Sequence, residues 1–142
     1  MAFLTKDELK TVSDIEIVDI ITNLDDTIVA EIIAESIDKM KGFMSRFYDI
    51  ESIFDQQGDD RKKSVVKRLK DIVIYEIYER HTRSTNDVAA RRYAEAMDWL
   101  EKVYTGELGD RTLPPKPPVE TDGQGSTGDI RFGGSIKYDS AY

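Results

Sequence analysis

Apolar residues recur every three or four positions in three long stretches of the chain, which is the pattern of amphipathic helices. The first stretch extends to about Tyr48, the second begins at Lys63, and the third stops before Gly106, a residue that suits a helix end. The apolar positions, in order, are Ile28, Ile32, Ile33, Ile37, Met40, Met44 and Phe47; Val65, Val66, Leu69, Ile72, Val73 and Ile77; and Ala90, Tyr93, Met97, Leu100, Val103 and Tyr104. Aromatic residues on or beside these stripes are expected in the core, namely Tyr75, Tyr78, Tyr93, Trp99 and Tyr104.

Side chains that accept hydrogen bonds from the free amides of a first turn indicate where helices begin. Two capping boxes, Thr5 with Glu8 and Ser13 with Glu16, predict two short helices ahead of the long ones. The long helices have candidate caps of their own, which are Asp25 and Asp26 for the first and Asn86 or Asp87 for the third. Short connections favour antiparallel neighbours. The predicted fold class is all-α, a small antiparallel helical bundle of three main helices plus two short N-terminal helices.

The composition changes sharply near Thr112. All four prolines lie within residues 113–118, and five of the nine glycines follow them. Proline pairs favour extended polyproline conformation and cannot continue a helix. We therefore expect residues 1–110 to form the helical domain and residues 111–128 to form an extended Pro- and Gly-rich linker.

Residues 129–142 have the alternation of a strand. Apolar and polar residues alternate on either side of the Gly133-Gly134 pair. A lone strand or hairpin is unstable in water, so this strand-like tail is expected to pair with a partner, the alternative being plain disorder. The predicted partner anchors are its apolar side chains, Ile130, Phe132, Ile136, Tyr138 and Tyr142.

The residue types offer little support for enzymatic chemistry. The chain has no cysteine, and its single histidine, His81, excludes paired-histidine metal motifs. Residues 123–128 match G-x-G-x-x-G, but no strand is expected before them and no helix after them, so a linker is the better interpretation. The carboxylates lie on expected solvent faces or at caps, without a pocket that would separate their pKa values. We therefore expect a non-enzymatic protein with no cofactor and no metal site.

The formal net charge of -8 argues against ordinary wrapping of nucleic acid, because affinity for phosphates depends on clustered Lys and Arg. One basic cluster nevertheless opens the second long helix. Three interpretations remain: a solvated helix face, docking against the acidic surface of a neighbouring copy or partner, and contact with DNA. The docking interpretation makes the members of the cluster inter-subunit candidates, namely Arg61, Lys62, Lys63, Lys67, Arg68 and Lys70.

Nothing in the sequence predicts a membrane partner. No apolar run approaches the roughly 20 residues that a membrane span requires. The first eight residues, MAFLTKDE, lack the basic and then apolar layout of a signal peptide. The expectation is a soluble, unprocessed protein made in a reducing cytoplasm.

Several stretches resemble a known family. Residues 3–9 (FLTKDEL) are similar to a short first helix of type Y-x-T-x-x-D-L, and residues 42–48 (GFMSRFY) are similar to G-Y-L-x-x-R-Y. Residues 66–80 resemble a helix of type L-x-x-x-x-x-D-I-A-x-Y-x-L-Y, and residues 92–106 resemble the R-Y-x-x-A-x-x-W-L-x-x-x-x-x-G that follows it. In this order the motifs resemble the head-to-tail adaptor family of Mu-like phages and prophages, whose members are also described as head completion or connector proteins.

The resemblance implies a role as well as a fold. It implies a homo-oligomer, a dodecameric ring beneath the portal protein, which extends the DNA channel and offers a platform to tail completion or stopper proteins. DNA would pass through the lumen without sequence-specific binding, and the protein would lie in the virion neck after synthesis in the host bacterial cytoplasm. The motif positions are mostly packing residues, so the resemblance specifies a fold and a role more than any site.

A different class of function is also compatible with the charge. A small acidic helical protein can act free in the cytoplasm as a regulator, a DNA mimic or an anti-host factor. A DNA mimic would be an acidic monomer or dimer that competes for a nucleic-acid-binding partner. The location of the protein in a phage particle discriminates between the two classes.

Overall fold

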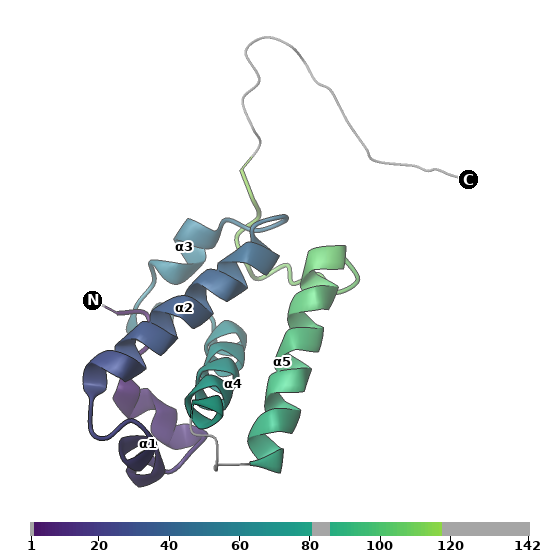
Figure 1. Cartoon of the computed structure of the whole chain (residues 1–142). Coiled ribbons are helices and arrows are strands. Elements are labelled where there is room, and N and C mark those ends of the chain that lie inside the picture. The colour runs from purple at the N-terminus through teal and green to yellow at the C-terminus, as the bar shows by residue number, and fades with distance from the viewer. Residues whose placement is uncertain (1, 81–85, 118–142) are drawn as a thin grey trace, which may run out of the picture.

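A computed structural model describes residues 2–80 and 86–117, which form an all-α domain without a strand in those ranges (Figure 1). The fold class predicted from the apolar periodicity is thereby confirmed. In chain order the elements are the 3-10 helix η1 (Lys6–Thr11), α1 (Ile15–Ile21), α2 (Asp26–Met44), α3 (Ile50–Phe54), the 3-10 helix η2 (Gly58–Asp60), α4 (Lys63–Glu79) and α5 (Asp87–Thr105).

Helix α4 forms the centre of the core. It packs against both α2 and α5, which also contact each other, and η1 and α1 cover one end (Figure 1). Figure 1 views α4 nearly along its axis, whereas α2 and α5 extend across the view. Its side chains are buried on most of its circumference, at Val65, Val66, Leu69, Asp71, Ile72, Val73, Ile74, Ile77 and Tyr78. A helix buried this widely depends on packing more than on intrinsic propensity.

Most helix starts lie where the capping residues place them. The Thr5 and Glu8 capping box opens η1, and the Asp25 carboxylate accepts the Thr27 amide at 3.0 Å at the start of α2. The Asn86 side chain accepts the Ala89 amide at 3.0 Å and so caps α5. These local hydrogen bonds explain why the sequence was sufficient to place these ends.

The predicted capping box at Ser13 is wrong by one residue. Asp14 caps α1 and accepts the Glu16 amide at 2.9 Å. The Ser13 hydroxyl lies instead 3.3 Å from the Tyr78 hydroxyl, which links the start of α1 to the end of α4. Asp and Ser are almost equally good caps, so a tertiary contact of the serine decides between them.

The first long helix is shorter than predicted. Helix α2 ends at Met44, and Asp49 then caps α3, a short helix that the sequence analysis did not anticipate. Tyr48, between the two, is buried, and its hydroxyl accepts the Asp110 amide at 2.8 Å. The chain therefore leaves the helix early because Tyr48 is held by the segment after α5.

Some predictions about burial on α4 and α5 also need correction. Trp99 and Tyr78 are buried, as expected, but Tyr104 is 47% exposed, and Tyr75 and Tyr93 are only half-buried. Ala90, predicted in the apolar stripe, is exposed, while its neighbour Ala89 is buried. Neighbouring positions on a helix differ by about 100° in direction, so whether Ala89 or Ala90 is buried depends on a small rotation of the helix.

The domain continues past the expected boundary at residue 110. Leu113 is only 3% exposed and belongs to the core. The Asp49 amide donates to the Pro114 carbonyl and the Lys116 amide to the Phe47 carbonyl, each at 2.9 Å. The first part of the predicted 111–128 linker thus lies against residues 47–49, because proline favours an extended backbone whose carbonyls still accept hydrogen bonds.

Several sequence predictions concern residues that lie outside the described ranges. These are His81, the glycine motif at 123–128 and the strand-like tail at 129–142 with its anchors Ile130, Phe132, Ile136, Tyr138 and Tyr142. They remain predictions.

Gly106 ends α5 in the left-handed conformation, with φ of +86°. Replacing Gly106 by Ala is expected to lower the free energy of unfolding by about 1–2 kcal/mol, because a Cβ disfavours this conformation. Urea denaturation measures the loss. Gly109→Ala is the matched control, since a Cβ there meets nothing within 4 Å; equal losses in the two variants would contradict the capping role of Gly106.

Candidate functional site

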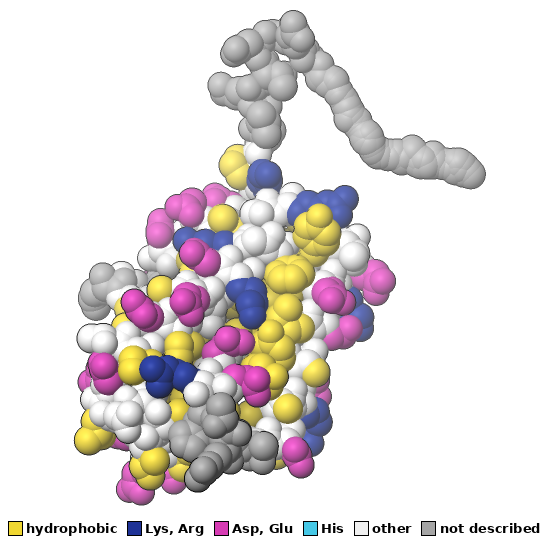
Figure 2. All heavy atoms as spheres, viewed as in Figure 1, with side chains coloured by type: hydrophobic (Ala, Val, Ile, Leu, Met, Phe, Trp, Pro, Cys, Tyr) yellow, Lys and Arg dark blue, Asp and Glu magenta, His cyan; other side chains and the backbone are white. Residues whose placement is uncertain are grey.

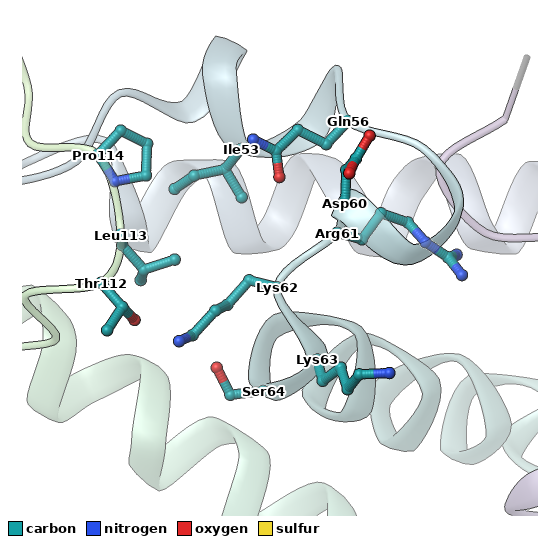
Figure 3. Close-up of a pocket in the computed structure, with 10 residues that line it drawn as sticks. All are labelled: Ile53, Gln56, Asp60, Arg61, Lys62, Lys63, Ser64, Thr112, Leu113 and Pro114. Atoms are coloured by element: carbon teal, nitrogen blue, oxygen red, sulfur yellow. The ribbon is translucent and has the colours of Figure 1, made fainter.

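The basic stretch at residues 61–70 opens α4, beside η2 and beside the segment that follows α5 (Figure 3). Lys62 occupies the N-cap position without a side-chain cap, and the first turn of α4 holds no acidic residue. A pocket of about 500 Å³ lies here, between Lys62, Ser64 and residues 112–114. The stretch therefore concentrates positive charge at a helix end that is already positive.

Arg61 is committed to contacts inside the molecule. Its guanidinium donates to the Glu8 carboxylate, with Nη2 to Oε2 at 2.5 Å, and to the Phe3 carbonyl at 2.6 Å. The side chain is only 15% exposed. The hydrogen bond from Arg61 holds the pKa of Glu8 below its ordinary value. Arg61 fastens the N-terminal segment to the start of α4, which is a structural role.

The Glu8–Arg61 pair predicts a pH dependence of stability. Because the folded-state pKa of Glu8 is lowered, its contribution is present above its unfolded pKa, about 4.3, and is lost as pH falls through the folded value. Glu8→Gln should therefore destabilise the domain at pH 7 and should flatten the loss of stability between about pH 5 and pH 3. Urea denaturation at several pH values measures this. Glu31→Gln, an exposed position on α2, should leave the pH profile of the wild type unchanged.

Two further members of the stretch also face their own chain. The Lys62 ammonium lies 4.0 Å from the Asp110 carboxylate, and the Arg68 guanidinium lies over the Trp99 ring, 5.9 Å from its centroid. Both contacts join the start of α4 to α5 or to the segment after it. Arg61, Lys62 and Arg68 therefore stabilise the domain, which reduces the charge they can offer to another subunit.

The remaining three lysines line a second hollow on the surface, next to the pocket described above. Lys63 is exposed, Lys67 is 59% exposed, and the Lys70 ammonium donates to the Thr11 hydroxyl at 3.0 Å. They line an open cleft of about 370 Å³, whose apolar floor includes Val12 and Val66. We call it the α4 cleft. Asp59 and Arg61 line it too, so its apolar floor is bordered by a rim that is positive on balance and holds one carboxylate.

Asp71 is the buried carboxylate of this region. Its side chain is 1% exposed; Lys67 donates to Oδ2 at 3.2 Å, and Oδ1 has no partner in the described part of the chain. A cavity of about 20 Å³ lies beside it, lined also by Asn86 and Arg92. That volume suits one water molecule. The geometry fits a structural polar site in the core and leaves no room for a substrate.

A second surface was missed by the sequence analysis. Figure 2 shows hydrophobic side chains in a run between α2 and α5. Phe43 and Tyr104 meet edge to face at 6.3 Å, and Tyr75 and Tyr93 stack at 4.0 Å. These side chains are partly exposed. Tyr75, Tyr93 and Tyr104 were predicted as core residues, and no prediction was made for Phe43.

No group of three or more His, Asp or Glu side chains within residues 2–80 and 86–117 is arranged to hold a metal ion. In the same ranges, no helix is long and apolar enough to cross a membrane.

A comparison with models of protein families assigns the chain to one family. The model of the family described as bacteriophage Mu, Gp36 matches residues 1–126. The chain belongs to the bacteriophage Mu Gp36 family. No curated protein and no solved structure matches it. The Gp36 match shows a phage-related protein and extends beyond the last described residue of the domain.

Two of the four motifs noted in the sequence of this Gp36-family chain, residues 66–80 and 92–106, lie on α4 and α5, which contact each other. From residues 92–106, Ala96 and Leu100 are fully buried, Trp99 is almost so, and Gly106 is the C-cap. Tyr93 stacks on Tyr75 of α4. The apolar residues of these two motifs thus belong to the core, whereas Lys67 and Lys70, which lie within residues 66–80, line the α4 cleft.

Proposed function

We propose that this chain is a non-enzymatic head-to-tail adaptor of a tailed phage. In this proposal it forms a homo-oligomeric ring beneath the portal, extends the DNA channel, and offers a platform to tail completion or stopper proteins in the virion neck. The observation that carries the proposal is the Gp36 family match over residues 1–126, together with the adaptor-like motif that builds the α4–α5 contact.

The distribution of charge is compatible with such a ring. Residues 11–38 hold eight acidic side chains and no Lys or Arg, whereas residues 61–70 hold six basic side chains and no acidic one. A net acidic subunit repels DNA that has to slide through a lumen. Separated acidic and basic surfaces also favour contacts between unlike faces of neighbouring copies.

The C-terminal tail is proposed to fasten the ring to its partner. Residues 130–138 would add as a strand to an exposed sheet edge of the portal or of a neighbour, with the apolar anchors in alternate pockets. The segment that leads into the tail is held against the domain, because the Lys116 amide donates a hydrogen bond to the Phe47 carbonyl. A spacer of ten extended residues, 119–128, would carry it about 30 Å from the domain.

Binding to the purified portal protein encoded with this chain tests the proposal. The full chain should bind, and deletion of residues 119–142 should weaken binding at least about tenfold while leaving the thermal unfolding of the domain unchanged. Replacing only Phe132 and Tyr138 by Ser should reproduce the deletion if these anchors act as proposed. Absence of binding by the full chain would contradict the adaptor role, and equal binding of the deleted chain would contradict the role of the tail.

A further inference from the structure

Three aliphatic side chains on and just after α1 lie on the surface: Ile17, Ile20 and Leu24. We call them the α1 patch. Ile20 is 72% exposed and Leu24 is 74% exposed, although other apolar residues of the same segment, Val18 and Ile21, are buried. Figure 2 shows hydrophobic and acidic side chains together over α1, at the lower left of the molecule. The patch contributes little to the core of its own chain.

The backbone at this patch is strained. Asn23 and Leu24 have φ of +55° and +62°, in the left-handed region between α1 and α2. Gly is preferred in that region and Asn is tolerated, whereas the Cβ of a leucine makes the conformation sterically unfavourable. In this chain Leu24 adopts the unfavourable conformation, and its side chain is nevertheless exposed. The Leu24 amide donates to the Asp19 carbonyl at 2.8 Å, so the backbone conformation closes the end of α1, but the leucine side chain buries little there. A large apolar side chain at such a position indicates a contact with something else.

The surroundings of the patch define its partner. All eight charged side chains of residues 11–38 are acidic, and Glu16 flanks Ile17 and Ile20 in sequence and is exposed. Lys6 pairs with Asp19 and Asp26, and the structure shows no such pair for Glu16 within the described residues. A surface that receives this patch must therefore have an apolar floor and a positive rim.

The α4 cleft has both properties. Val12 and Val66 line its floor. Its rim carries four basic side chains, Arg61, Lys63, Lys67 and Lys70, and one carboxylate, Asp59, so the rim is positive on balance. Its volume of about 370 Å³ exceeds the roughly 150 Å³ that encloses a benzene-sized group, so one or two aliphatic side chains fit. The patch and the cleft share no residue, and each combines apolar side chains with charges that are opposite in net sign to those of the other.

We propose that the α1 patch of one copy docks into the α4 cleft of the next copy. Leu24 and Ile20 would enter the cleft, and the acidic side chains around them would face Lys63, Lys67 and Lys70. Such a contact joins two different surfaces, so it repeats around a ring and leaves no copy unpaired when the ring closes. The inference rests on the proposed adaptor function for the ring and names the surfaces that build it.

Engineered disulfides test the contact directly, because the natural chain has no cysteine. The full chain carrying both Leu24→Cys and Lys63→Cys is assembled with portal protein, oxidised, and separated without reducing agent. We expect a ladder of dimers, trimers and larger species, because each copy then carries one cysteine on each side of the contact. Each single variant should give monomer. Val88→Cys with Lys63→Cys is the matched control, since Val88 is an exposed apolar residue on α5.

A ladder from the Leu24 pair alone supports the contact. No ladder, or an equal ladder from the Val88 pair, would overturn it. A single variant that forms dimers would indicate a symmetric contact and would also overturn it.

Leu24→Gly separates binding from folding. Glycine suits the backbone at this position, so the variant should unfold at the same temperature as the wild type or higher. Its self-association should weaken about ten- to hundredfold, as expected for the loss of one buried leucine. Analytical ultracentrifugation of the full chain measures the self-association. An unchanged association constant would overturn the proposal.

The two proposals fail in different ways. Portal binding without a Leu24–Lys63 ladder would keep the adaptor function and overturn this contact. A ladder from the purified chain that binds no portal would keep this contact and remove the adaptor function.

Discussion

Leu100→Ala is expected to lower the free energy of unfolding by about 2–5 kcal/mol, the range for deleting a fully buried leucine side chain. Leu100 is 0% exposed and lies on α5, whose contact with α4 is the most extensive in the domain. Its removal leaves a cavity beside a helix that is buried on most of its circumference, so the surroundings can relax little. Urea denaturation, with the slope held constant, measures the loss.

Val88→Ala is the control for that change. Val88 lies on the same helix and is 43% exposed, so its truncation should change stability by no more than about 0.5 kcal/mol. A small loss at Leu100 would show that the α4–α5 contact is not the centre of the core.

Leu113→Ala is expected to cost about 2–5 kcal/mol, although the residue lies after the last helix and directly before the prolines. Leu113 is only 3% exposed and is held in place by the backbone hydrogen bonds of Pro114 and Lys116 to residues 47–49. Loss of the side chain removes apolar contacts and weakens the docking of the segment that carries the tail.

Deletion of residues 119–142 is the matched comparison, because it removes the rest of the tail and leaves Leu113, Pro114 and Lys116 in place. That deletion should leave the free energy of unfolding within about 0.5 kcal/mol of the wild type. If Leu113→Ala were as harmless as the deletion, the segment 111–117 would be a linker, as composition alone suggests.

The helices were predictable because their causes are local. Apolar periodicity and the caps Asp25 and Asn86 act within a few residues, and both predicted caps are confirmed. The early end of α2 and the existence of α3 were not predictable. They depend on Tyr48 and Asp49 meeting residues 110 and 114, more than 60 positions away in the chain.

The basic stretch shows a similar limit. Six basic residues within ten positions look like one surface, but a helix turns them in different directions. Arg61 and Arg68 contact Glu8 and Trp99 of their own chain, and Lys67 pairs with the buried Asp71. Lys63 is exposed at the rim of the α4 cleft. The sequence predicted the charge, and only the fold divides it into structural and available parts.

The α1 patch carried one signal that sequence reasoning passed over. Leu24 follows Asn23 in a turn flanked by acidic residues, where a polar residue or glycine is usual. A large apolar residue in such a turn is informative by itself. Its conformation, which supplies the argument from strain, could come only from the structure.

The adaptor function is tested most directly by locating the protein in phage particles. Negative-stain images of particles labelled on this chain should show the label at the junction of head and tail, in a ring around the channel axis. Signal only in the cell lysate, as an acidic monomer or dimer that competes for a nucleic-acid-binding protein, would contradict the adaptor function and would favour a free regulatory protein.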